Sequence, residues 1–269
     1  MTTRLAGMIA AAVLAAIVLA ALLTPALGTA AGITQDRSAP FAPPGQAYWL
    51  GTDGFGRDEF ARLLRGARVS LSAGVLATAI ALACGLLSGA AAGYYGGWGD
   101  DWIARATELF QSLPWFYLVL AVRAFLPLSL PEGTALLAIA AITGFTGWPR
   151  LSRLVRGIVL SERQRDYVAA ARAFGASDFY LIRRHILPAV YGVVLVQAVL
   201  LIPQFILAEV TLSFLGLGIG EPAPSLGTML AALRDLHVLT AYPWMLAPAA
   251  LLVLLTGCCQ VLAKWMQQS

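Results

Sequence analysis

Residues able to do covalent chemistry are few in this sequence and far apart. The two histidines, His185 and His237, are separated by a long apolar segment, so they are not placed to share a metal ion or to activate one serine. Neither a Gly-x-Ser-x-Gly sequence nor a Gly-x-x-x-x-Gly-Lys-Ser/Thr phosphate loop occurs. The sequence therefore predicts no catalytic residue, no cofactor site and no metal site in this chain.

Glu209 is the only acidic residue well inside a segment that we expect to span a membrane, since Glu108 stands at the very start of its predicted span. An ionisable group at that depth is costly, which makes it a functional candidate. Two interpretations stay open: Glu209 lines a path through the membrane or a subunit interface, or it lies near the external end and reaches water or a helix terminus. Three cysteines, Cys84, Cys258 and Cys259, lie in apolar segments without metal-binding or redox spacing, so free buried thiols are expected.

An arginine-rich connection lies between two apolar segments, at about residues 150–188. Its eight arginines face only three acids: Arg150, Arg153, Arg156, Arg163, Arg165, Arg172, Arg183 and Arg184 against Glu162, Asp166 and Asp178. Such an excess is typical of cytoplasmic connections in membrane proteins. With an even number of spans, both termini are then cytoplasmic, and residues 28–68 are external in spite of their own five arginines.

Within this connection the sequence predicts a helix, a turn and a second helix. Ser161 with Gln164 fits a capping box, and the alanine-rich segment Asp166–Phe174 favours a helix that Gly175 is placed to end. Tyr167, Ala171 and Phe174 fall on one face of this helix. Small residues at 170 and 171 keep its profile thin enough to enter a groove on another protein.

The second helix is expected to start at Ser177 and to stop at Pro188. It carries Phe179, Ile182 and Ile186 on one side with Arg183 and Arg184 beside them. A docking surface is one interpretation, and a loop that packs on its own bundle is the other. A DNA-binding helix-turn-helix is disfavoured because both ends are tied to membrane segments.

The elements that position these residues are apolar helices. The chain is 59% hydrophobic and 12% charged, and its mean hydropathy is +0.77, which predicts an all-α membrane protein. Its basic residues lie mostly in short connections between apolar segments, which disfavours nucleic acid as the reason for its basic charge. About six spans are predicted from runs long enough to cross a bilayer. They are Leu5–Leu27, Val69–Ala92, Thr107–Leu126, Thr134–Trp148, Pro188–Leu215 and Tyr242–Ala263.

Three regions are expected: an N-terminal span (1–27), an external connection with an interfacial helix capped by Asp58 (28–68), and a membrane core (69–269). The first span reads as an anchor, with a cleaved signal peptide as the alternative. Pro114 is expected to kink the third span, and Arg123 to snorkel to the headgroups. A short external helix is expected at 226–236.

Glycines at every fourth position of the second span predict close helix packing. They are Gly85, Gly89 and Gly93. Small residues at this spacing allow two backbones to approach each other in a membrane. The turn-rich segment that follows, 93–99, holds tyrosines and a tryptophan suited to the membrane interface.

Three motifs carry a resemblance to a known family. The segment Asp166–Gly175, DYVAAARAFG, followed by Pro188 in RHILP, resembles the EAA loop of ABC importer permeases. GTDGFGRD at 51–58 and LSFLGLG at 212–218 resemble signatures of the dipeptide/oligopeptide/nickel branch, in its second (C-type) permease subunit. Two departures are Ala169, where the general pattern has Glu, and His185, where it has Ile.

The resemblance implies a permease subunit of a bacterial inner-membrane importer that moves peptides or a related small solute and hydrolyses nothing itself. Its implied partners are a second homologous permease, two cytoplasmic ATPases, an external solute-binding protein and membrane lipid. The implied ATPase-coupling residues are Asp166, Tyr167, Ala170, Ala171, Phe174, Gly175, Arg183, Arg184 and Pro188. An ion-coupled secondary transporter is the alternative, although the sequence lacks the internal repeats typical of that class.

Overall fold

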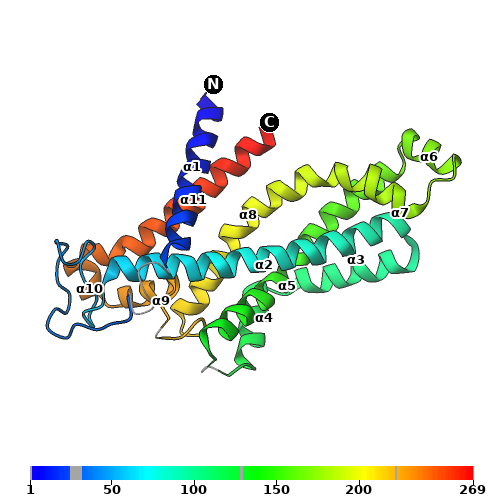
Figure 1. The fold of residues 1–269 in the computed structure, drawn as a ribbon. Coiled ribbons are helices and arrows are strands. Elements are labelled where there is room, and N and C mark those ends of the chain that lie inside the picture. Colours follow the sequence, from blue (N-terminus) through cyan, green and yellow to red (C-terminus); the bar gives the residue numbers. More distant parts are fainter. Residues whose placement is uncertain (1, 25–31, 128–129, 222, 269) are drawn as a thin grey trace. The chain divides into compact units, whose positions relative to one another are not determined.

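The computed structural model describes residues 2–24, 32–127, 130–221 and 223–268, which form helices joined by turns and no regular strand (Figure 1). In chain order the main helices are α1 (Thr2–Leu22), α2 (Glu59–Tyr95), α3 (Gly97–Ser112), α4 (Trp115–Ala124), α5 (Glu132–Arg163), α6 (Asp166–Ala173), α7 (Asp178–Leu181), α8 (Leu187–Phe214), α9 (Leu226–Ala231), α10 (Leu236–Ala241) and α11 (Ala247–Gln268). The predicted all-α fold is confirmed.

Four helical segments in the described residues are long and apolar enough to cross a membrane. They are Arg4–Leu22, Glu59–Tyr95, Asp178–Phe214 and Pro243–Gln268. They agree with the predicted first, second, fifth and sixth spans. The apolar helix Trp115–Ala124 is shorter, and at 1.5 Å per residue it reaches about half of a ~30 Å hydrocarbon layer. The predicted number of six spans therefore stays a prediction.

The separate interfacial helix expected before the second span is wrong. Asp58 does cap a helix there, since its Oδ1 accepts hydrogen bonds from the backbone N–H of Phe60 at 2.9 Å and of Ala61 at 3.3 Å. That helix is α2 itself, which continues to Tyr95 without a break. The charged residues Arg62, Arg65 and Arg68 therefore lie in the first turns of the same helix that continues as the apolar second span.

The expected third and fourth spans also differ from the structure. Pro114 does not kink one helix but separates α3 from α4, because Leu113 before it is extended (φ −84°, ψ 133°), as a residue preceding proline prefers. The helix of the expected fourth span does not end at Trp148, because α5 continues through Pro149 to Arg163, and the end of the membrane span itself stays a prediction. Residues 150–163 of the predicted connection thus belong to α5, and residues 164–186 form α6, α7, η2 (Ile182–Ile186) and the turns that join them.

The described chain divides into two compact units, 1–75 with 123–140 and 199–269, and 76–122 with 141–198. The first unit has a core in which Ala67, Ile206, Leu226 and Leu255 are fully buried. These residues come from α2, α8, α9 and α11. Within the same unit α1 packs along α11, so close at Gly7 that an added Cβ would meet the ring of Trp265.

The core of the second unit joins α2 to α5 through the predicted glycines. A Cβ at Gly85 would lie 2.8 Å from Leu151, and one at Gly93 would lie 2.8 Å from the carbonyl oxygen of Arg156. Gly89 faces the carbonyl oxygen of Ser152 in the same way. The predicted packing role of the three glycines is confirmed, because only the missing side chains allow this approach.

Candidate functional site

The arginine-rich connection folds into a short loop structure, residues 164–186, which we call the docking loop. Its first helix is α6, whose N-cap is Arg165 without a side-chain hydrogen bond. The expected capping box of Ser161 and Gln164 is wrong: Ser161 lies in the last turn of α5 and its carbonyl oxygen accepts a hydrogen bond from the N–H of Gln164 at 3.2 Å. The alanine-rich segment forms a helix as predicted.

The turn after α6 is built on Gly175, as predicted. Gly175 has φ +83°, a left-handed conformation that glycine adopts without steric cost. Its N–H donates to the carbonyl oxygen of Arg172 at 3.0 Å, and the N–H of Ala176 donates to that of Ala171 at 3.1 Å. These two bonds form a Schellman motif, which ends the helix and fixes the direction of the chain that follows.

The second loop helix starts as predicted but does not stop where expected. The hydroxyl of Ser177 accepts a hydrogen bond from the N–H of Tyr180 at 3.4 Å, capping α7. A π-helical turn, η2 (Ile182–Ile186), then leads directly into α8. The prediction that Pro188 ends this helix is wrong, because the wide π-turn and the position of Pro188 in the first turn of α8 accommodate its missing N–H.

Tyr94, at the end of α2, joins the two loop helices. Its hydroxyl accepts a hydrogen bond from Arg172 of α6 at 2.9 Å and donates one to Asp178 of α7. Arg172 and Asp178 also form an ion pair, with 3.6 Å between Nη2 of the arginine and Oδ1 of the aspartate. Tyr94 is 3% exposed, so a buried side chain of α2 holds the end of α6 and the start of α7.

Below this polar contact the docking loop is fastened by apolar side chains. Val168 of α6, Leu181 of α7 and Ile186 of η2 are at most 1% exposed. Ile186 belongs to the core formed with α2 and α5. Phe179, which we expected on the same side as Ile186, is 73% exposed instead, because the π-turn between them changes the helical register. The loop is therefore a rigid element on the second unit.

The outer surface of the docking loop combines aromatic rings, small residues and arginines. Phe174 is 93% exposed, and Tyr167 and Tyr180 are each about half exposed. The ring of His185 lies between the two tyrosines, with centroids 5.6 Å and 5.7 Å away. Of the predicted coupling residues, Ala171 is half-buried and the others are exposed: Asp166, Tyr167, Ala170, Phe174, Gly175, Arg183, Arg184 and Pro188. All of these residues except Pro188 lie on the docking loop, and Pro188 lies in the first turn of α8.

Charged contacts beside the docking loop were missed by the sequence analysis. Arg156 of α5 donates from Nε to Oδ1 of Asp100 in α3, and from Nη2 to Oδ2 of the same carboxylate at 2.5 Å. These bonds hold the pKa of the Asp100 carboxyl below its usual value. On the loop itself, Tyr167 donates its hydroxyl proton to Glu162, which raises the pKa of Tyr167. Opposite charge was the only sequence signal that linked Arg156 to Asp100, and no sequence signal linked Tyr167 to Glu162.

Glu209 is 1% exposed and lies inside the first unit. Its carboxylate accepts hydrogen bonds from Ser70 of α2 at 2.5 Å and from Ser213 of α8 at 2.6 Å. Ser70 in turn accepts one from the N–H of Leu226 at 3.2 Å, at the start of α9. This arrangement favours the helix-terminus interpretation of Glu209, and it gives no support to a role along a path.

Arg123 does not snorkel as expected. It is 2% exposed and donates to the carbonyl oxygens of Leu217 at 2.6 Å, Leu126 at 3.1 Å and Pro127 at 3.1 Å. A guanidinium presents five donors in a fixed plane, which suits several carbonyl groups at once. Arg123 therefore fixes the end of α4 and the glycine-rich turn after α8, within the first unit.

Comparison with known proteins places these features in a family. A family model described as "binding-protein-dependent transport system inner membrane component" matches residues 81–269, a region that holds the docking loop and Glu209. The chain is 38% identical over 224 residues to the oligopeptide transport system permease protein OppC of Mycobacterium bovis, covering 83% of this chain and 75% of the relative. The dipeptide transport system permease protein DppC of Bacillus subtilis is 40% identical over 197 residues, with coverage of 73% and 60%.

Proposed function

The chain belongs to the family of inner-membrane components of binding-protein-dependent transport systems, and we propose that it conducts peptides or related small solutes and receives the force of ATP hydrolysis through its docking loop. It is a multi-pass permease subunit of an ABC importer and not itself an enzyme. The peptide class rests on what the names of the two relatives say of those proteins.

The observation that carries the coupling role is the exposed aromatic surface on a rigid loop. Phe174 and Phe179 are 93% and 73% exposed, although large aromatic side chains gain most when a partner covers them. Ala170, which stands between Arg165 and Arg172 in the sequence, has a small side chain that leaves room for α6 to enter a groove on another protein. Tyr94 ties the loop to α2, so that a displacement of the loop is passed to a membrane helix.

We further propose the arrangement that this role requires. The docking loop and both termini face the cytoplasm, two ATPases bind from that side together with a second permease, and a solute-binding protein delivers solute from outside. The family supports these classes of partner in general. The proposal assigns no catalytic residue, metal or cofactor to this chain, and residues 69–269 form the permease core.

The test is recovery of the importer through a tag on this chain. Wild-type protein in detergent is expected to bring down a second permease and ATPase subunits with ATPase activity. The double substitution Ala170→Asp with Ala171→Asp places two negative charges on the surface of α6 that is proposed to contact the ATPase. The ATPase subunits are then expected to be absent from the purified complex, while the second permease is retained. Gln267→Asp with Gln268→Asp adds the same charge at two exposed positions at the end of α11, outside the docking loop, and serves as the control in which the ATPases should be retained. Solute transport by the chain without any ATPase would contradict the proposal.

A further inference from the structure

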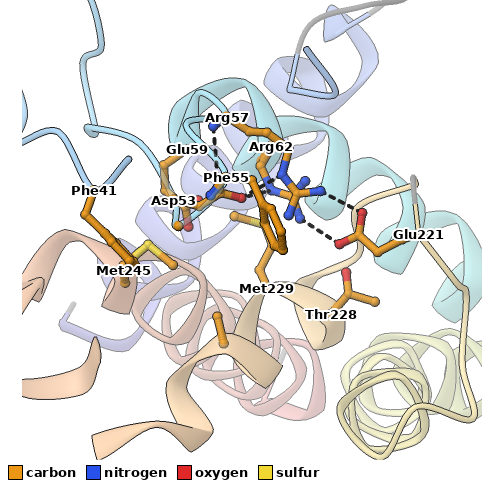
Figure 2. A pocket seen from close by; sticks show the side chains of 12 residues that line it. Phe41, Asp53, Phe55, Arg57, Glu59, Arg62, Glu221, Thr228, Met229 and Met245 are labelled. Carbon is orange, nitrogen blue, oxygen red and sulfur yellow. Dashed lines mark hydrogen bonds and ion pairs between the residues drawn. The ribbon is translucent and has the colours of Figure 1, made fainter. Parts of the chain in front are cut away.

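A cavity of about 270 Å³ lies in the first unit, between the external connection, the first turns of α2 and α9 (Figure 2). It contains five charged side chains from distant parts of the sequence: Asp53, Arg57, Glu59, Arg62 and Glu221. It belongs to a different unit from the docking loop. The proposed coupling role therefore leaves this cavity without a function.

Both arginines of the cavity are neutralised by partners in the chain. Arg57 donates to Asp53 at 2.7 Å and to Glu221 at 2.8 Å. Arg62 donates to Glu221 at 3.2 Å, and its guanidinium lies 3.5 Å from Asp53. These four groups, two positive and two negative, are drawn with their dashed contacts in Figure 2. Their charges cancel, and their hydrogen-bonding groups are largely occupied by one another.

Glu59 is the fifth charged group, and one of its oxygens has no partner. The residue is 1% exposed, and its buried Oε1 receives no hydrogen bond among the described residues. Buried carboxylate oxygens are nearly always hydrogen-bonded, because an unsatisfied one loses its hydration without compensation. The cavity that Glu59 lines therefore lacks a hydrogen-bond donor, and with Glu59 in its ionised form the charges of its five charged side chains sum to −1.

The remaining walls are mostly apolar. Phe41, Phe55, Met229 and Met245 line the cavity with Ala232. Aromatic faces attract cationic groups, and the flexible methionine side chains adapt to the shape of an apolar group. A metal ion fits less well, since the described residues include no group of three ligands able to hold one. The missing donor is better supplied by an ammonium group on an apolar stem.

We propose that this cavity binds a small solute through a primary ammonium group, with the carboxylate of Glu59 as its acceptor and the phenylalanine and methionine side chains around its apolar stem. The volume is near the lower limit of small-molecule pockets, which restricts the bound part to about one amino-acid side chain. The site does not depend on ATP-driven coupling, so its test is binding and not transport.

The experiment titrates the full-length chain in detergent with leucinamide, which carries an ammonium group on a leucine side chain. Saturable binding is expected by calorimetry, and N-acetylleucinamide, in which the ammonium is blocked, is expected not to bind. Glu59→Gln keeps the size of the side chain and removes its charge, so leucinamide should bind at least tenfold more weakly. Glu108→Gln makes the same change at an exposed position of α3, and this variant should bind leucinamide as the wild type does.

A second variant keeps the proposal falsifiable if Glu59→Gln does not fold. Ala232→Leu narrows the cavity at an exposed position without touching the carboxylate, and it should also weaken leucinamide binding at least tenfold. Equal binding of leucinamide and its acetylated form would show a merely apolar pocket and overturn the proposal. Unchanged binding in either variant, or no binding to the wild-type chain, would overturn it as well.

Discussion

The hydroxyl of Tyr94 donates a hydrogen bond to the carboxylate of Asp178, although the two residues are 84 positions apart in the chain. The same hydroxyl accepts from Arg172. One phenol therefore holds the end of α6 and the start of α7 against the end of α2. Neither an arginine nor a carboxylate alone would satisfy both partners, because the phenol both donates and accepts.

Removing that hydroxyl should loosen the docking loop. In Tyr94→Phe the ring stays in the core, but the hydrogen bonds to Arg172 and Asp178 are lost. Because both partners can still reach water, the free energy of unfolding should fall by only about 1 kcal/mol. Because Arg172 and Asp178 can still pair with each other, the chain should fold. We expect fewer solute molecules transported per ATP hydrolysed by the reconstituted importer.

The control for this prediction is the neighbouring tyrosine. Tyr95 is 66% exposed, so Tyr95→Phe should leave both the thermal midpoint and the transport-to-hydrolysis ratio unchanged. If Tyr94→Phe transported with the wild-type ratio, the link from the docking loop to α2 would not be part of coupling.

A methyl group at Gly89 should separate α2 from α5. Its Cβ would meet the carbonyl oxygen of Ser152 and the side chain of Val155, and backbone atoms cannot turn away. Gly89→Ala is expected to lower the free energy of unfolding by about 1–3 kcal/mol, read from thermal denaturation in detergent.

A matched glycine in α5 makes this prediction specific. A Cβ at Gly157 would have open space around it, and alanine is favoured over glycine within a helix by about 0.5–1 kcal/mol. Gly157→Ala should therefore leave the thermal midpoint unchanged or raise it. Equal effects of the two substitutions would contradict the role of close packing at Gly89.

The sequence was sufficient to predict helices and their local signals, but not where charge would be tolerated inside them. Asp58, Gly175 and Ser177 act on residues within a few positions, and all three do what their types predict. Helix ends were misplaced where a charged segment was taken as a boundary. The first turns of α2 stay helical because Arg62 is paired with Asp53 and Glu221.

Long-range pairing is what the sequence could not supply. α5 continues through Pro149 because Leu151, Val155 and Val159 pack on the α2 glycines, which offsets the lost backbone hydrogen bond. Tyr94 was assigned to the membrane interface with its neighbours, yet it is buried between two loop helices. An aromatic residue in a turn gives no sign of partners so far along the chain.

Glu209 should matter for stability more than for solute passage. Glu209→Ala leaves the hydroxyls of Ser70 and Ser213 without their acceptor in a buried site, which should cost about 3 kcal/mol. Glu209→Gln keeps one acceptor oxygen and should cost less. In thermal denaturation the midpoint should therefore be highest for the wild type, lower for Glu209→Gln and lowest for Glu209→Ala.

The same variants separate the two interpretations of this residue. If Glu209 only holds α2, α8 and the start of α9 together, Glu209→Gln should transport in proportion to the amount of folded protein. A folded, stable Glu209→Gln variant that no longer transports would instead favour a path-lining role.

The ion pair of Asp100 with Arg156 should make part of the stability depend on pH. Because hydrogen bonds from Arg156 lower the pKa of the folded Asp100 carboxyl, its stabilisation is complete above the unfolded value, about 3.9, and is lost as the pH falls through the lower folded value. At neutral pH the contribution is at most about 1 kcal/mol, since the Arg156 side chain is 37% exposed. Asp100→Asn should therefore lower the thermal midpoint slightly at pH 7 and reduce its fall between pH 5 and pH 3. If the pH profile of Asp100→Asn were identical to that of the wild type, the pair would contribute nothing to stability.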